Sequence, residues 1–352
     1  MKPMMLIFLL TFPTFAQLRP VHTFSIVARD PQTGEMGVAV QSHAFSVGPI
    51  VAWAEAGVGA IATQSLADPS YGKLGLDLMR AGKTAPDTLL GLLNADKSCE
   101  MRQVAMIDSK GNVSTFTGTK NIAAAGGIAG QHGLQGQQKT ITANCGSAGG
   151  TLLNGNGYSV QANLMSNDQV WPAMADAFRN SKGDLAERML AALDAAQSAG
   201  GDIRGKQSAA LIIVKAQSSG KPWEDTVYNL RVDDNPEPLK ELRRLALLQR
   251  AYNHSNEGDH AIERKDDETA LREYSAAAQT IEGRPDIPKS TYAEFIYWHV
   301  VSLVTMKRVE ESLPIFKKAF ELEPNWREVV PRLSKAGLLP DDETLIRRIL
   351  SQ

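Results

Sequence analysis

The chain has 352 residues, 43% of them hydrophobic and 22% charged, which is typical of a globular protein and not of a disordered one. Its net charge of -2 gives bulk electrostatics no reason to favour nucleic acid or an anionic membrane surface as a partner. The sequence contains no metal-ligand spacing of Cys and His, no P-loop and no Rossmann glycine pattern. We therefore expect no metal ion and no cofactor.

The first residues are predicted to be a targeting segment. Lys2 precedes an apolar stretch, residues 4–12, that is too short for a lasting membrane anchor. Thr14 and Ala16 are small residues at the two positions that a signal peptidase recognises. We predict a signal peptide at 1–16 and an exported, periplasmic or extracellular protein with no membrane span after cleavage. An uncleaved N-terminal anchor is the alternative.

Two apolar runs, residues 22–30 and 37–42, predict a β-hairpin whose first strand begins at Thr23. They flank a turn-rich segment at 30–34. The second run ends in Gln41 and Ser42, where a buried strand would normally stay apolar. A hydroxyl at the start of one strand and an amide–hydroxyl pair at the end of the next are a first hint of a site.

The following stretch predicts more strands and two helices. Residues 36–64 are dense in Gly, Ala and Val, which indicates successive buried strands, including one at 49–53. Helices are expected at about 70–82 and 85–94, and a second hairpin from strands at 101–107 and 113–117. Periodicity is absent from 118 to 157, so we expect surface loops there with one short strand at 140–143.

Beyond residue 157 the pattern alternates between strands and helices. Strands are expected at 158–164, 209–214 and 225–232. Helices are expected from a cap at Asn167 or Asp168 through residue 178, and from 185 to the glycines at 200–201. Strands, then helices, then strands argue for an α+β layered domain over residues 23–232.

A change in composition marks a second region. Residues 233–238 are polar and contain proline, which predicts a linker before an all-α region at 239–352. One pattern occurs twice in this region, as Ala270, Tyr274 and Ala277 and again as Ser312, Phe316 and Ala319. Such spacing lets antiparallel helices nest and resembles the tetratricopeptide repeat, with a longer loop around 283–290. A plain helical bundle would show similar periodicity.

The sequence contains two cysteines, Cys99 and Cys145. In an oxidising compartment they could form one disulfide. Two unpaired thiols are the alternative.

Several motifs over residues 23–232 resemble the bacterial domain of unknown function family 1028. They are the segments 22–30, 37–42, 53–60, 102–103 and 161–163, and the Gly-Gly-Asp-Ile-Arg-Gly-Lys-Gln-Ser-Ala-Ala block at 200–210. This family is similar in fold to N-terminal-nucleophile hydrolases. The resemblance therefore implies a four-layer αββα sandwich, two antiparallel sheets between helical layers, and hydrolysis of an unknown substrate.

The resemblance also implies a nucleophile. In such hydrolases the first residue of the mature chain attacks an amide, and its free α-amine, with a pKa of about 8, accepts the proton. Thr23 is the residue in that position. The expected cut after Ala16 leaves residues 17–22 ahead of Thr23, so a second processing event is needed to free its amine. Without one, Thr23 is an ordinary strand residue.

Polar residues at strand ends complete the candidate site. Asp202 and Arg204 would orient the nucleophile or bind a substrate carboxylate through the forked donors of Arg, or they are a structural pair that holds a turn. Six others would bind substrate and supply an oxyanion hole, or satisfy buried backbone groups: Gln41, Ser42, Gln103, Asn163, Gln207 and Ser208. A Ser42–His43 dyad is disfavoured, because adjacent strand residues point to opposite faces.

Two hypotheses about function remain. In the first, the protein is an exported amide or peptide hydrolase with Thr23 as its nucleophile. In the second, it is a non-catalytic binding or assembly protein of the cell envelope, and residues 239–352 bind a protein partner.

Overall fold

The protein is described from a computed structural model that covers residues 22–130, 139–143 and 149–352, with the backbone alone for 139–143. The predicted signal peptide at 1–16 lies outside these residues, and so does Cys145. Cys99 is buried and disulfide-bonded, so the alternative of an unpaired thiol at this position is wrong.

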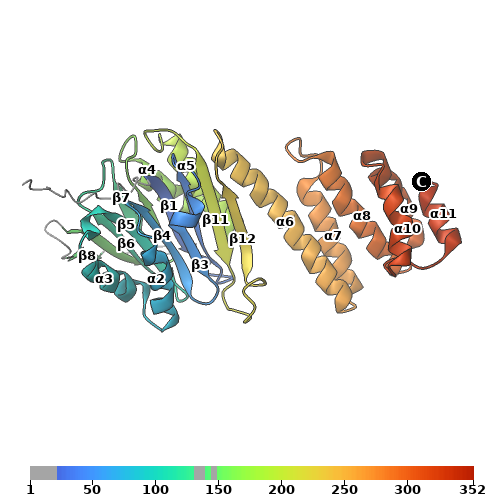
Figure 1. Cartoon of the computed structure of the whole chain (residues 1–352), viewed down its shortest axis with the longest axis horizontal. Helices are drawn as coiled ribbons and strands as arrows, with labels where there is room; N and C mark the ends of the chain where they lie inside the picture. Colours follow the sequence, from blue (N-terminus) through green and yellow to red (C-terminus); the bar gives the residue numbers. More distant parts are fainter. Residues whose placement is uncertain (1–21, 131–138, 144–148) are drawn as a thin grey trace, which may run out of the picture.

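Two six-stranded antiparallel sheets make up the N-terminal part (Figure 1). The first sheet has the order β12-β11-β2-β1-β10-β7, with β1 at Thr23–Arg29, β2 at Met36–Ser42, β7 at Gly126–Ala129, β10 at Tyr158–Ala162, β11 at Ser208–Val214 and β12 at Thr226–Val232. The second has the order β3-β4-β5-β6-β9-β8, with β3 at Ala52–Glu55, β4 at Gly59–Ser65, β5 at Arg102–Asp108, β6 at Asn112–Gly118, β8 at Lys139–Ala143 and β9 at Gly150–Asn156.

Alternation along the strands divides their side chains between two cores. In β1, Phe24 and Ile26 pack under helices α4 (Val170–Asn180) and α5 (Leu185–Ser198), on the outer face of the first sheet. Val27 instead joins the apolar layer between the two sheets. Helices α2 (Ser70–Arg80) and α3 (Ala85–Ala95) pack on the outer face of the second sheet. Side chains that face inward at the start of β1 therefore lie between the sheets.

The predicted α+β character, with a C-terminal helical region, is confirmed, but two local predictions are wrong. The strand predicted at 49–53 begins only at Ala52, as β3, because Gly48–Val51 is the short helix α1 with Pro49 in its first turn, where a missing N–H does no harm. The loops predicted between 118 and 157 include β7 and β9 besides the expected β8. Their glycines hide the strand pattern. A Cβ on Gly150 would meet the Phe116 ring at 2.3 Å, so close packing excludes a larger residue there.

The C-terminal region consists of α6 (Pro238–Glu263), α7 (Asp267–Ile281), α8 (Lys289–Thr305), α9 (Val309–Leu322), α10 (Trp326–Lys335) and α11 (Glu343–Leu350). Figure 1 shows α6 running from beside β12 toward the remaining helices. The first turns of α6 bury Leu239, Leu242 and Ala246 in the outer core of the first sheet. Further along α6, Ala251 is buried in a core cluster with Ala277 of α7 and Phe295 of α8. Because α6 contributes to the core of the first sheet and to this core, it joins the helical region to the sheet.

The two copies of the sequence pattern fall on equivalent helices. Ala270, Tyr274 and Ala277 lie on α7, and Ser312, Phe316 and Ala319 lie on α9; all six are buried. Residues 282–288 form the loop between α7 and α8.

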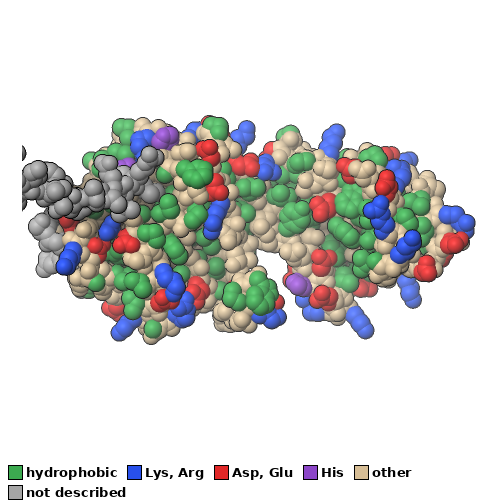
Figure 2. Space-filling model, in the orientation of Figure 1, with side chains coloured by type: hydrophobic (Ala, Val, Ile, Leu, Met, Phe, Trp, Pro, Cys, Tyr) green, Lys and Arg blue, Asp and Glu red, His purple; other side chains and the backbone are tan. Residues whose placement is uncertain are grey.

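Charged side chains of both signs are interspersed over the face shown in Figure 2. Within the ranges that the structure describes, no helix is both long and apolar enough to cross a membrane. The described residues also contain no group of three or more His, Cys, Asp or Glu arranged to hold a metal ion.

Candidate functional site

The start of β1 lies between the sheets, and Thr23 is fully buried there. Thr23 pairs in register with Ser42 at the end of β2. Its carbonyl oxygen accepts hydrogen bonds from Gln64 Nε2 and from the backbone N–H of Asn163, both at 3.1 Å. The nucleophile that the sequence suggested is therefore fixed by strands of both sheets.

The peptide bond that precedes Thr23 is held by two donors. The carbonyl oxygen of His22 accepts a hydrogen bond from Ser42 Oγ at 2.5 Å and another from Arg204 Nη2 at 3.0 Å. One donor is a hydroxyl and the other is a cation. Both polarise the carbonyl group and stabilise negative charge on its oxygen. This geometry brings three predicted site residues to one bond.

Asp202 holds Arg204 in place. Its carboxylate accepts from Arg204 Nε at 3.0 Å and from Arg204 Nη2 at 2.6 Å, and the backbone N–H of His43 donates to it at 3.2 Å. The Asp202 side chain is fully buried, whereas that of Arg204 is 29% exposed. The pair thus fixes the turn and also aims Arg204 at the His22 carbonyl, so the two interpretations of this pair are compatible.

The His22 side chain is buried against Asn163. Its Nδ1 lies 2.9 Å from Asn163 Oδ1. Burial lowers the pKa of His22 below its ordinary value, although the hydrogen bond to Asn163 opposes this shift. The imidazole is therefore neutral at neutral pH.

A network of buried amides supports the site from the second sheet. Gln103 Oε1 accepts from Gln64 Nε2 at 2.7 Å and from Asn163 Nδ2 at 2.9 Å. Gln103 Nε2 donates to the carbonyl oxygen of Ala162 at 2.9 Å and to Thr117 Oγ1 at 3.0 Å. These bonds join strands of the two sheets across the interior, so Gln103 and Asn163 lie beside Thr23.

Three residues of this network were missed in the sequence: Ser25, Gln64 and Gln161. Ser25 Oγ donates to Gln64 Oε1 at 2.6 Å, and Gln161 Nε2 donates to Ser25 Oγ at 2.5 Å. Ser25 and Gln64 each stand on the inward face of a strand, next to an apolar residue of the same face, Val27 in β1 and Ala62 in β4. That alternation was the signal that could have revealed them.

The remaining predicted residues do not converge on Thr23. Gln41 pairs with Phe24 and Ala209 and faces the outer core, because it follows Val40 on the strand and so points the other way. Within the described part of the chain, neither polar atom of its amide has a hydrogen-bond partner. Gln207 donates to Asp234 at the surface, and Ser208 Oγ donates to the carbonyl oxygen of Ala44. Gln207 and Ser208 hold neighbouring loops in place.

The comparisons with known proteins identify the family. The model of a family of unknown function, DUF1028, matches residues 23–144 and 133–242, and the chain belongs to this family. A crystal structure of a DUF1028 protein from Silicibacter pomeroyi is 28% identical, with a TM-score of 0.48. The match covers 64% of this chain and 84% of that one. No curated protein matches.

Proposed function

We propose that the protein is an exported amide or peptide hydrolase in which Thr23 is the nucleophile, exposed by cleavage of the His22–Thr23 bond. The observation that carries the proposal is the pair of hydrogen bonds from Ser42 and Arg204 to the carbonyl oxygen of this bond. Two sheets between helical layers fit the N-terminal-nucleophile fold that the family resemblance implies, and the disulfide at Cys99 is typical of a compartment outside the cytosol.

The cleavage step is an intramolecular acyl transfer. Thr23 Oγ adds to the carbonyl carbon of His22, the bond to the Thr23 nitrogen breaks, and the hydroxyl proton is transferred to that nitrogen. Water then hydrolyses the ester, which leaves a carboxylate on His22 and both a free hydroxyl and a free amine on Thr23. Ser42 and Arg204 stabilise the oxyanion that forms in each addition.

The same groups then serve the substrate. Departure of the buried His22 vacates the space beside Thr23 and Asn163, where the acyl part of an amide fits. Arg204, fixed by Asp202, and Ser42 receive the substrate carbonyl, and the Thr23 amine accepts the hydroxyl proton. The amides of Gln64 and Gln103 hold the strands that position Thr23.

The test is N-terminal sequencing and intact mass of the protein recovered from its native host, together with an amide-substrate screen. The wild type is expected to begin at Thr23, whereas Thr23→Ala keeps residue 22. Ser42→Ala is expected to slow processing by about 10²-fold or more, as loss of an oxyanion donor does. Gln207→Ala is the matched control, because Gln207 bonds to Asp234 at the surface. A wild-type chain that begins at Gln17, or full hydrolysis by Thr23→Ala, would contradict the proposal.

A second candidate function is protein binding through a tetratricopeptide-like helical region. The observation that favours it is the burial of the same pattern positions on α7 and α9, which supports repeated helix pairs. Such pairs form a concave surface that accommodates a partner segment. Substituting residues of that surface and measuring the binding of a protein partner would test this function. Deletion of α6 is unsuitable, because Leu242 of this helix belongs to the core of the first sheet.

A further inference from the structure

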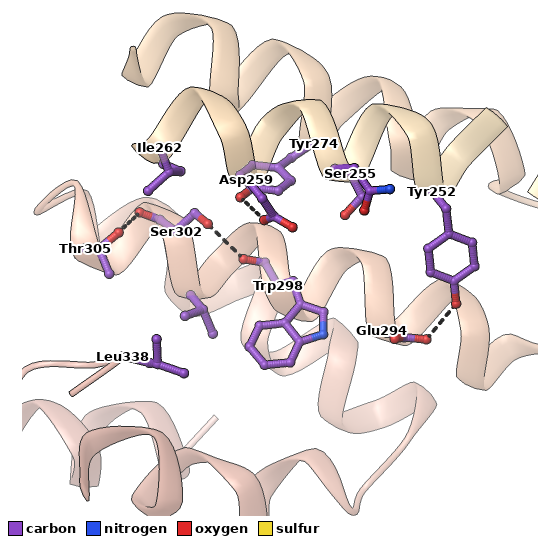
Figure 3. A pocket seen from close by; sticks show the side chains of 12 residues that line it. Tyr252, Ser255, Asp259, Ile262, Tyr274, Glu294, Trp298, Ser302, Thr305 and Leu338 are labelled. Carbon is purple, nitrogen blue, oxygen red and sulfur yellow. Dashed lines mark hydrogen bonds between the residues drawn. The ribbon is translucent and has the colours of Figure 1, made fainter. Parts of the chain in front are cut away.

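A cavity of about 480 Å³ lies in the helical region between α6 and α8 (Figure 3). Tyr252 and Asp259 of α6 face Glu294, Trp298 and Ser302 of α8 across it, and the exposed Leu338 closes one side. None of these residues belongs to the Thr23 site. The cavity is therefore a separate place where a ligand can bind.

The lining is acidic and aromatic. It contains two carboxylates, Asp259 and Glu294, and no Lys, Arg or His. Tyr274 Oη donates to Asp259 at 2.6 Å and Tyr252 Oη donates to Glu294 at 3.2 Å. Both partners are neutral, and neither carboxylate forms an ion pair with any residue that the structure describes. Two fixed negative charges thus remain uncompensated beside the cavity.

The part between the two carboxylates contains the indole of Trp298 on α8 and the polar side chain of Ser255 on α6 (Figure 3). Trp298 is partly buried, and Ile262, Val301 and Leu338 add further apolar lining to the cavity. The face of an indole ring attracts a cation, and a neighbouring carboxylate attracts the same cation by its negative charge. The same indole offers apolar contact to an aliphatic side chain.

Glu294 lies at one end of the cavity, beside Tyr252, and Asp259 lies nearer its middle (Figure 3). Tyr252, which binds Glu294, and Asp259 are two turns apart on α6, which corresponds to about 10 Å along its axis. In an extended polyproline-type peptide, side chains three residues apart lie on one side and about 9 Å apart. Two basic residues at that spacing therefore match the two carboxylates.

We propose that this cavity binds an extended segment of a protein partner that carries two Lys or Arg residues three positions apart, with an apolar side chain between them against Trp298. Charge complementarity selects this occupant, because an acidic or uncharged segment would leave both carboxylates unpaired. The binding site is independent of the Thr23 proposal, since no residue is shared.

The test is isothermal titration calorimetry of the full mature protein with the peptide acetyl-Ala-Lys-Ala-Leu-Lys-Ala-amide. Asp259→Asn and Glu294→Gln are each expected to weaken binding about three- to tenfold, and Trp298→Leu about tenfold. The matched control is Glu263→Gln, which removes a charge from α6 at a side chain that is 78% exposed and outside the cavity. Its affinity should equal that of the wild type. Circular dichroism checks that each variant is folded.

Three results would overturn the proposal. They are binding no weaker for the three cavity variants than for Glu263→Gln, equal binding of a peptide with Glu in place of both Lys, and no binding at millimolar peptide. Sedimentation that shows a dimer dissociated by the cavity variants would assign the surface to a second copy and overturn it as well. Thr23→Ala should bind the peptide like the wild type, so failure of the hydrolase proposal and failure of this one are distinguishable.

Discussion

The interior of the sandwich and the cavity of the helical region use polar side chains in opposite ways. Around Thr23 the amides are fully buried, and each bonds to several others: Gln103 alone makes bonds to Gln64, Asn163 and Ala162. In the helical cavity, Asp259 is exposed and Glu294 partly exposed, and tyrosine hydroxyls are their hydrogen-bond partners. The buried amides fix the strands around Thr23 in one geometry, whereas the carboxylates of the helical cavity keep their charge available to a ligand.

This difference separates stability from binding. A buried network loses several partners when one member is removed, because each orphaned group has left water without compensation. A half-exposed carboxylate is rehydrated when it loses its partner. Substituting such a carboxylate therefore changes ligand binding more than the stability of the fold. The predictions below test this contrast, from the largest expected effect to the smallest.

Gln103→Leu should strongly destabilise the sandwich. The substitution removes one hydrogen-bond partner each from the amides of Gln64 and Asn163 and from the carbonyl of Ala162, so we expect a loss of about 3 kcal/mol or more in the free energy of unfolding. Urea denaturation followed by circular dichroism measures it. Gln207→Leu is the control at the surface, and equal losses for the two variants would contradict the contrast.

Gly258→Ala should destabilise the helical region. An added Cβ would meet the Tyr274 ring at 2.8 Å, so the helix pair α6–α7 must separate or the ring must move. We expect a net loss of about 1–2 kcal/mol, since overpacking outweighs the gain in helix propensity. Thermal unfolding measures it. Peptide binding should weaken too, because Tyr274 orients Asp259; unchanged stability would show that this contact is loose.

Gly91→Ala is the control for Gly258→Ala, because it also changes a helical glycine but adds a Cβ that has no close neighbour. Gly91 lies on α3, and a Cβ there meets nothing within 4 Å. We expect a gain of about 0.5–1 kcal/mol, because Ala favours the helix over Gly. A loss in the same thermal assay would mean that the Gly258 result cannot be ascribed to Tyr274.

His22 should make the stability depend weakly on pH. Burial lowers its pKa in the folded state below 6.5, so the unfolded chain binds the proton more readily. Stability is then complete above about pH 6.5 and decreases as the pH falls below that value. Denaturation between pH 7 and 5 in the Thr23→Ala background, which keeps residue 22, measures it. His22→Gln should flatten this slope, and an unaltered slope would contradict the assignment.

Most of the fold could be predicted from alternation. The hairpin of β1 and β2 and the helices α2 to α5 follow from periodic apolar residues and turn signals. The strands β7 and β9 could not be predicted this way, because glycines occupy positions that packing restricts, as Gly150 does against Phe116. The environment that stabilises them comes from neighbouring strands far away in the chain.

The candidate site could also be predicted only in part, because it depends on contacts between residues far apart in the chain. Thr23, Ser42 and Arg204 meet at one carbonyl, although 162 residues separate the last two along the chain. Gln41 was grouped with Ser42 because the two are adjacent, yet the pleat turns them to opposite faces. Ser25 and Gln64 were missed because each looks like an isolated polar residue until the two sheets bring them within hydrogen-bonding distance.

The sequence by itself determined most of the strands and helices and that the chain resembles DUF1028, because periodicity and motifs are local properties of the chain. Only the tertiary structure decided which polar groups converge on the His22–Thr23 bond and that Asp259 and Glu294 flank one cavity. Hydrogen bonds and charge pairs depend on distances of a few ångströms between residues distant in sequence, and packing of the sheets and helices sets those distances.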